Sequence, residues 1–114
     1  MALTIIQLFA PTQLGLAAAV IYSAPTSPTT SVVKNGRVRL TNTTGAAETV
    51  TLYVAPSATG SSAANCCLNA VSIAANSYLD VDLPTLAAGD TLRGKSGAVA
   101  NAITVHEIGG VLYS

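Results

Sequence analysis

Hydrophobic and polar residues alternate with a period of two along three stretches of this chain. In residues 37–41, Val38 and Leu40 share one face and the polar residues share the other. Residues 49–54 and residues 78–83 repeat the pattern. Successive side chains of a β-strand point to opposite faces of its sheet, so each stretch predicts a half-buried strand. Because no helical stripe is longer than two turns, the pattern predicts an all-β fold.

Weaker strand signals fill the rest of the chain, separated by turn-forming residues. Further strands are expected at residues 3–9, 19–23, 31–34, 68–73, 90–95, 102–108 and 111–113. Short connections between about eight strands predict an antiparallel β-sandwich, of jelly-roll or immunoglobulin-like type. The 114 residues have the length of one domain, spanning 1–114, with residues 1–13 a candidate N-terminal arm.

The Asn35–Gly36 pair admits two interpretations. It fits a two-residue hairpin turn between residues 32–34 and 37–39, and it also fits a bulge inside one long strand. The long strand is favoured, because residues 30–42 would then pair with residues 49–54 across the intervening turn and bury more surface.

The composition adds a prediction about association. Charged residues make up 9% of the chain and hydrophobic residues 50%, with a formal net charge of zero. Soluble domains average about 25% charged residues. Because so weakly charged a surface lacks self-repulsion, we expect a homo-oligomer, either a dimer or a trimer, or an assembled particle.

Charge and hydropathy also argue against several partners. Five basic residues balance five acidic ones, so no basic field attracts nucleic acid. The apolar N-terminal stretch has no Lys or Arg before it, as a secretory signal would need. Residues 14–22 are too few to span a bilayer, which takes about 20 apolar residues. We therefore expect neither a nucleic acid nor a membrane as partner.

Candidate catalytic and metal-binding residues are few. His106 is the only histidine, so a Ser–His–Asp series would depend on it, and we expect a surface histidine instead. Cys66 and Cys67 are adjacent, point to opposite faces of an extended chain, and form no C-x-x-C motif. We expect no enzymatic activity, no cofactor and no bound metal.

Asp80 and Asp82 lie on the same face of a predicted strand. Together with Asp90 they give the crudest outline of a calcium site. Cross-strand ion pairs are favoured instead, since the chain has no calcium-loop spacing. The basic residues at outward strand positions are Arg37, Arg39, Arg93 and Lys95.

Tyr53 and Tyr78 fall on the outward faces of their predicted strands. Exposed tyrosines among threonines and alanines suit a protein interface, because a ring offers a large contact area at little entropic cost. They equally suit the role of ordinary strand-forming residues that cover a sheet. Both interpretations stay open from the sequence alone.

Three stretches, placed on the predicted strands, carry a resemblance. They are RVRLTNTTGAAETVTLYVAP at 37–56, SIAANSYLDVDLPTLAAGDTLRGKSG at 72–97 and AITVHEIGG at 102–110. Together they resemble small virion proteins of tailed bacteriophages, in which an L-T-N-T strand end, a V-T-V-Y-like strand, an A-x-N-S segment and an L-x-x-G-D-T-L-R-like strand follow one another. These motifs mark strands and turns, so they identify an architecture better than a role.

The resemblance implies a structural role in the virion, without catalytic residues. Such proteins decorate or cement capsid surfaces, so the expected partner is the major capsid protein or another virion protein, and the expected place of synthesis is the bacterial host cytoplasm. The apolar N-terminal stretch is expected to add as a strand to a neighbouring subunit. The residues expected at the interface are Leu3, Ile5, Ile6 and Phe9, with Tyr53 and Tyr78.

Two alternative functions remain. Similar sandwiches occur in tail and fibre components, so a tail adaptor or fibre-associated protein is the first alternative. A small carbohydrate-binding β-sandwich is the second, although the chain has no Trp to serve as a sugar-stacking platform.

Overall fold

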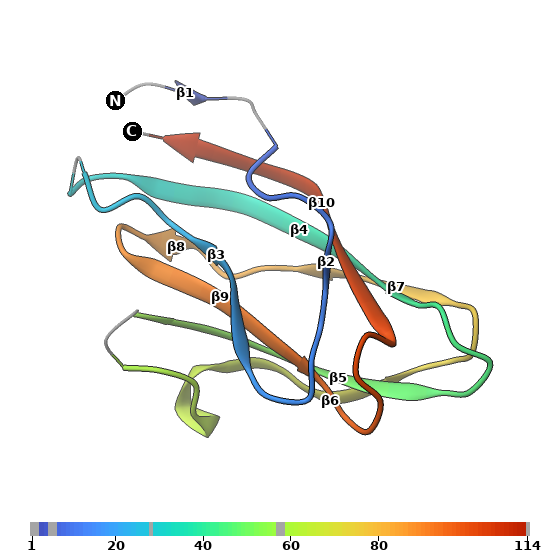
Figure 1. Cartoon of the computed structure of the whole chain (residues 1–114). Coiled ribbons are helices and arrows are strands. Elements are labelled where there is room, and N and C mark those ends of the chain that lie inside the picture. Colours follow the sequence, from blue (N-terminus) through green and yellow to red (C-terminus); the bar gives the residue numbers. More distant parts are fainter. Residues whose placement is uncertain (1–2, 5–6, 28, 57–58, 114) are drawn as a thin grey trace.

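The computed structural model consists of two antiparallel β-sheets stacked face to face (Figure 1). It describes residues 3–4, 7–27, 29–56 and 59–113. The strands are β1 (Leu3–Thr4), β2 (Thr12–Gln13), β3 (Ala19–Ser23), β4 (Val32–Asn42), β5 (Glu48–Pro56), β6 (Cys66–Ile73), β7 (Tyr78–Asp82), β8 (Leu86–Ala87), β9 (Asp90–Ser96) and β10 (Ile103–Tyr113), with a short 3-10 helix, η1 (Ala63–Asn65).

The first sheet has the strand order β1-β10-β4-β7, with β2 beside β10 and β8 beside β4. The second sheet has the order β3-β9-β5-β6. The all-β antiparallel sandwich is therefore confirmed. The expected number of about eight strands is not, because the described residues form a six-stranded and a four-stranded sheet. Three of these strands, β1, β2 and β8, have only two residues each.

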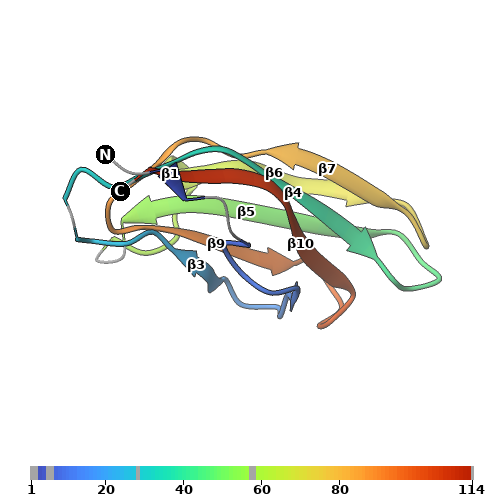
Figure 2. The same cartoon turned by 90° about the horizontal axis from the view of Figure 1, so that it is seen from above.

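The chain changes sheets between most of its long strands. Only β5 and β6 follow each other as neighbours in one sheet, among the long strands that the structure describes. The predicted pairing of residues 30–42 with residues 49–54 is therefore wrong. β4 pairs with β10, β7 and β8, whereas β5 pairs with β6 and β9. The connection after β4 crosses from one sheet to the other, so β4 and β5 lie in different layers (Figure 2).

β4 is one long strand, as the sequence favoured, and it is irregular at the Asn35–Gly36 pair. Asn35 adopts a left-handed backbone with φ 56°. Opposite it, β10 shifts register between Glu107 and Gly109 and again before Val111. Residues 102–108 and 111–113, predicted as two strands, therefore form the single strand β10, as residues 32–42 form β4. A bulge accommodates an extra residue on one strand without ending the hydrogen-bonded pairing.

The core lies between the sheets and follows the predicted alternation. The inward side chains of Val38 and Leu40 in β4 and of Val50 and Leu52 in β5 are fully buried. Those of Leu79, Val81 and Leu83 pack against this core while partly buried. Burying one such side chain contributes about 1.5–3 kcal/mol, so the alternation specifies which face of each strand turns inward.

Thr51 departs from that alternation. It occupies an outward position of β5, yet its side chain is only 7% exposed. β6 shifts register opposite it, and the Ala70 amide donates a hydrogen bond of 3.1 Å to Thr51 Oγ1. The neighbouring strand thus covers a residue that alternation alone would leave in solvent.

The N-terminal segment lies along β10 (Figure 1). Leu3 and Thr4 pair with Tyr113 and Leu112 near the end of β10, and β2 pairs with its beginning. The described strands of residues 1–13 therefore join the first sheet of their own chain. In the described part of the chain, no helix has the length and apolar character to cross a bilayer.

Candidate functional site

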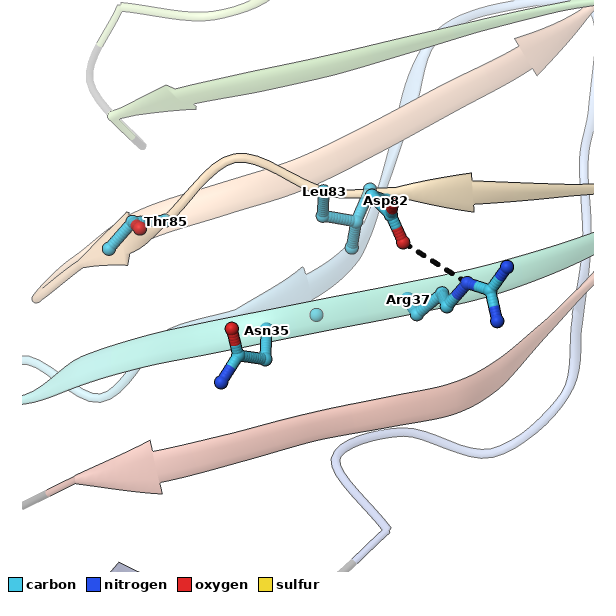
Figure 3. A pocket seen from close by; sticks show the side chains of 6 residues that line it. Asn35, Arg37, Asp82, Leu83 and Thr85 are labelled. Carbon is cyan, nitrogen blue, oxygen red and sulfur yellow. Dashed lines mark ion pairs between the residues drawn. The ribbon is translucent and has the colours of Figure 1, made fainter.

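A hollow of about 470 Å³ opens where β7 ends, between the irregular part of β4 and the connection to β8 (Figure 3). The Leu83 amide donates a hydrogen bond of 2.8 Å to the Gly36 carbonyl, which holds this connection against β4. A Cβ on Gly36 would lie 3.3 Å from Leu83 Cβ, so glycine permits the close approach. The residues that line the hollow are Asn35, Gly36, Arg37, Asp82, Leu83 and Thr85.

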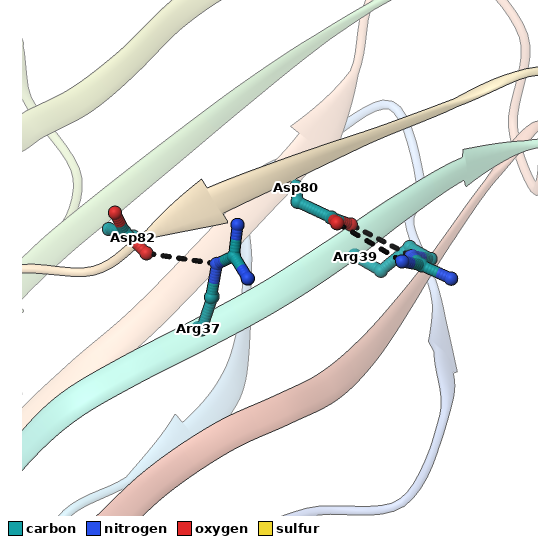
Figure 4. Close-up of polar contacts among 4 residues, drawn as sticks. All are labelled: Arg37, Arg39, Asp80 and Asp82. Atoms are coloured by element: carbon teal, nitrogen blue, oxygen red, sulfur yellow. Dashed lines mark hydrogen bonds and ion pairs between the residues drawn. The ribbon is translucent and has the colours of Figure 1, made fainter.

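Ion pairs between β4 and β7 continue from this hollow along the first sheet (Figure 4). Arg37 Nε lies 3.1 Å from Asp82 Oδ1, and Arg39 Nε lies 2.8 Å from Asp80 Oδ1. A second bond of 3.1 Å from Arg39 Nη2 to Asp80 Oδ2 makes that pair bidentate. The hydrogen bond from Arg39 lowers the pKa of Asp80 and raises that of Arg39. The cross-strand ion pairs predicted for these arginines are therefore present.

Tyr78, the first residue of β7, extends the same face along the strand. Its side chain is 57% exposed, and the Arg39 guanidinium carbon lies 4.2 Å from the centroid of its ring. Arg39 therefore contacts both the Asp80 carboxylate and the Tyr78 ring. This cation–π contact limits the freedom of an exposed aromatic ring, which favours its use as a contact residue.

A second hollow, of about 330 Å³, lies on the other sheet and is lined by Tyr53, Ala63, Cys66 and Asn69. Tyr53 and Cys66 are directly opposite each other in the β5–β6 ladder. Cys67 packs against the core instead, and burial, reinforced by Cys66, raises the pKa of its thiol. Both cysteines are free. Their predicted placement on opposite faces is confirmed.

The structure does not bring the expected interface residues together. Tyr53 lies in the second sheet and Tyr78 in the first. Phe9 is partly buried against the core, with its ring centroid 6.0 Å from that of Tyr22. Leu3 pairs with Tyr113 in the first sheet. Ile5 and Ile6 lie outside the described residues.

The residues considered for metal binding are dispersed. His106 is exposed on β10, directly opposite Arg39. Asp90 lies in the second sheet, away from Asp80 and Asp82, and its Oδ2 accepts a hydrogen bond of 2.9 Å from the Ala87 amide. Among the described residues, no group of three or more His, Cys, Asp or Glu side chains is placed to hold a metal ion.

The sequence did not predict an apolar surface beside β3. Leu16, Val20 and Val99 are each 50–53% exposed. Their signal in the sequence is the absence of charge, since Lys34 is the first charged residue of the chain. The hollow at Asn35 was also missed, because Leu83 and Thr85 reach it only through the pairing of β7 and β8 with β4.

No family model matches the chain, and neither a curated protein nor a solved structure matches it.

Proposed function

We propose that the protein is a structural component of a tailed-bacteriophage virion, a decoration protein that stabilises contacts between capsomers on the capsid surface. The observation that carries the proposal is a nested set of strand pairs. β5 pairs with β6, β4 with β7, β3 with β9, and β2 with β10.

This nesting supports the assignment of a jelly roll. A jelly roll is formed when a long antiparallel ribbon of eight strands folds over into two sheets, so its strands pair from the central hairpin outwards. Viral capsid proteins are a major class of jelly rolls. The sequence resemblance described above is likewise to virion proteins, the small ones of tailed bacteriophages. An immunoglobulin-like sandwich is less well supported, because it does not follow this nested order.

The distribution of charge supports a role in assembly. Only ten of the 114 residues are charged. Asp80 and Asp82 pair with arginines, and Glu48 is 6% exposed. Apart from the partly exposed ion pairs between β4 and β7, few charged groups would therefore have to be desolvated when other subunits cover the protein, which favours extensive protein contacts.

The proposed capsid contacts are the surfaces around Tyr53 and Tyr78, together with the N-terminal stretch containing Leu3, Ile5 and Ile6. Phe9 would anchor that stretch to the protein's own core, as its packing indicates. Each contact need bury only a standard interface of about 1,600 Å², because binding at several symmetric sites raises the effective concentration at each further site. The proposal assigns no catalytic role to any residue.

The proposal is tested by adding purified protein to phage particles that lack it and measuring copies bound and resistance to heat. Hundreds of copies and fewer ruptured particles are expected. A Tyr53→Ala, Tyr78→Ala double variant should bind at least about tenfold more weakly, whereas Gly45→Ala, at an open turn position, should bind normally. A handful of copies per particle would indicate a tail component instead. Unchanged heat resistance of fully decorated particles would contradict the capsid role.

A carbohydrate-binding function is the second candidate, favoured by the hollow beside β7. Asn35, Arg37, Asp82 and Thr85 offer donors and acceptors there, and Leu83 offers an apolar wall. Sugar-binding sites combine such groups, and usually also contain an aromatic side chain against which the sugar ring stacks. Binding on a glycan array that is lost in Asp82→Ala would support this candidate, and a silent array would remove it.

A further inference from the structure

We infer that β3 and the loops beside it form a self-association surface, at which β3 pairs antiparallel with β3 of a second copy around a two-fold axis. Within the described residues, β3 is the last strand of the second sheet and pairs only with β9. An edge strand presents unpaired backbone N–H and C=O groups, which match those of an identical antiparallel strand.

β3 has fewer of the features that protect the edges formed by β7 and β6. β7 carries Asp80 and Asp82, and charged residues discourage edge pairing. β6 shifts register at two places and contains Ala70 at φ 48°, which disrupts a straight edge. β3 has the sequence AVIYS, without charge or proline. Its one register shift, between Val20 and Tyr22, leaves paired residues on both sides.

The surface around β3 is uncharged over a long stretch of sequence. Residues 1–33 and 96–105 contain no Asp, Glu, Lys, Arg or His. These segments meet at Ser96, whose amide donates to the Gly15 carbonyl at 2.9 Å and whose hydroxyl donates to the Val99 carbonyl at 2.7 Å. Exposed Leu16 and Val99 therefore adjoin β3, which exposes Val20.

The absence of charge favours a second copy as the occupant. A two-fold axis brings the same surface of both copies together, so a surface bearing one sign of charge repels itself. At the β7 edge of the first sheet, such an axis would bring the aspartates of two β7 strands together. Two charged residues lie close to β3 in other strands: Arg93, directly opposite Val20, whose Nε donates to Thr91 Oγ1, and Glu107, whose charge raises the pKa of Tyr22 after burial has raised it more. β3 itself therefore adds no charge to the contact between two copies.

The test is sedimentation equilibrium of the purified full chain over a range of micromolar concentrations. The wild-type protein should approach twice the monomer mass of 11.4 kDa. Val20→Glu should raise the dimer dissociation constant at least about 30-fold, by placing like charges across the axis. Within the chain the new carboxylate lies opposite Arg93, which the fold tolerates. Leu16→Glu, in the adjoining loop, should also weaken the dimer.

The matched control is Ile108→Glu, which places the same charge at an exposed aliphatic position of β10 in the first sheet. It should leave the dissociation constant unchanged. Hydrogen exchange on the wild-type protein adds a test without variants, because amides of residues 19–23 should exchange more slowly as concentration rises. A monomeric wild-type protein, equal effects of Val20→Glu and Ile108→Glu, or concentration-independent exchange in β3 would each overturn the inference. None of these measurements requires phage particles, so their outcome is independent of the proposed capsid role.

Discussion

The carboxylate of Glu48 connects the start of β5 with the loop after β9. Its Oε1 accepts hydrogen bonds from the amides of Thr49 at 2.9 Å and Ala98 at 3.1 Å, and its Oε2 accepts one from Val99 at 2.7 Å. Burial raises the pKa of Glu48, but the backbone amides of this loop outweigh it and hold the pKa below the usual 4.5. The ionised carboxylate is therefore the form that the fold stabilises.

Glu48→Gln should lower the free energy of unfolding by about 1–3 kcal/mol at pH 7, because an amide accepts through only one of its two ends and leaves buried donors unpaired. The stabilisation by ionised Glu48 is complete above the unfolded pKa near 4.5 and disappears as the pH falls through the lower folded pKa. Urea unfolding of both proteins between pH 3 and 7 should show their difference shrinking below about pH 4.5. A constant difference across this range would contradict the assigned role.

Residue positions were predictable where alternation alone determines them. Arg37 and Arg39 share the face of Asp80 and Asp82 because all four occupy outward positions of their strands, and the ion pairs follow once β4 and β7 are neighbours. Asn35 was identified only as part of a turn or a bulge. Its left-handed φ and its place beside a hollow depend on β10 and on the β7–β8 connection, which no local pattern encodes.

At the scale of the element, β9 shows how closely neighbouring side chains approach a strand backbone. A Cβ on Gly94 would lie 2.9 Å from Leu52 Cδ2, 3.1 Å from Ile21 Cδ1 and 3.3 Å from Leu14 Cδ2. These side chains come from three different segments and fill the space that a side chain at position 94 would need. The glycine is therefore a packing requirement of the second sheet.

Gly94→Ala should destabilise the protein by about 1–2 kcal/mol, since overpacking costs about 1–3 kcal/mol and the reduced flexibility of the unfolded chain offsets about 0.4–1 kcal/mol. Gly45→Ala is the matched control, because no atom lies within 4 Å of the added Cβ and φ is not positive. It should be neutral or slightly stabilising. Urea denaturation measures both, and equal stabilities of the two variants would show that the packing at Gly94 is not tight.

The positions of the strands along the chain were more predictable than the pairing between them. The strand at residues 19–23 matches β3, because β-branched and aromatic residues between turn-forming segments define it locally. β2 and β8 were missed, since two residues are too few to show a period. The predicted pairing of β4 with β5 was wrong, because the two-residue period determines only which face of each strand turns inward. Two strands bury their inward faces equally well as neighbours in one sheet or in opposite sheets across the core, and β4 and β5 lie in opposite sheets.

For the whole molecule, nested pairing predicts an order of folding. The chain segment between the two strands of a pair is shortest for β5–β6, where it spans residues 57–65. It spans residues 43–77 for β4–β7 and residues 14–102 for β2–β10. The entropic cost of closing a loop rises with its length, so each inner pair shortens the effective loop for the next. The β5–β6 hairpin is therefore expected to form early, with β10 docking late.

Val50→Ala and Val105→Ala test this order with the same substitution at two fully buried positions. Each should cost about 2–3 kcal/mol, from two lost methyl groups and the cavity they leave. Val50 faces the core from β5, which pairs with β6, so its replacement should mainly slow folding, with a φ-value above about 0.5. Val105 lies in β10, so its replacement should mainly speed unfolding, with a φ-value below about 0.3. Stopped-flow folding and unfolding rates at a protein concentration low enough to keep the chain monomeric measure both values, and the reverse ranking would show that closure begins at the outer strands.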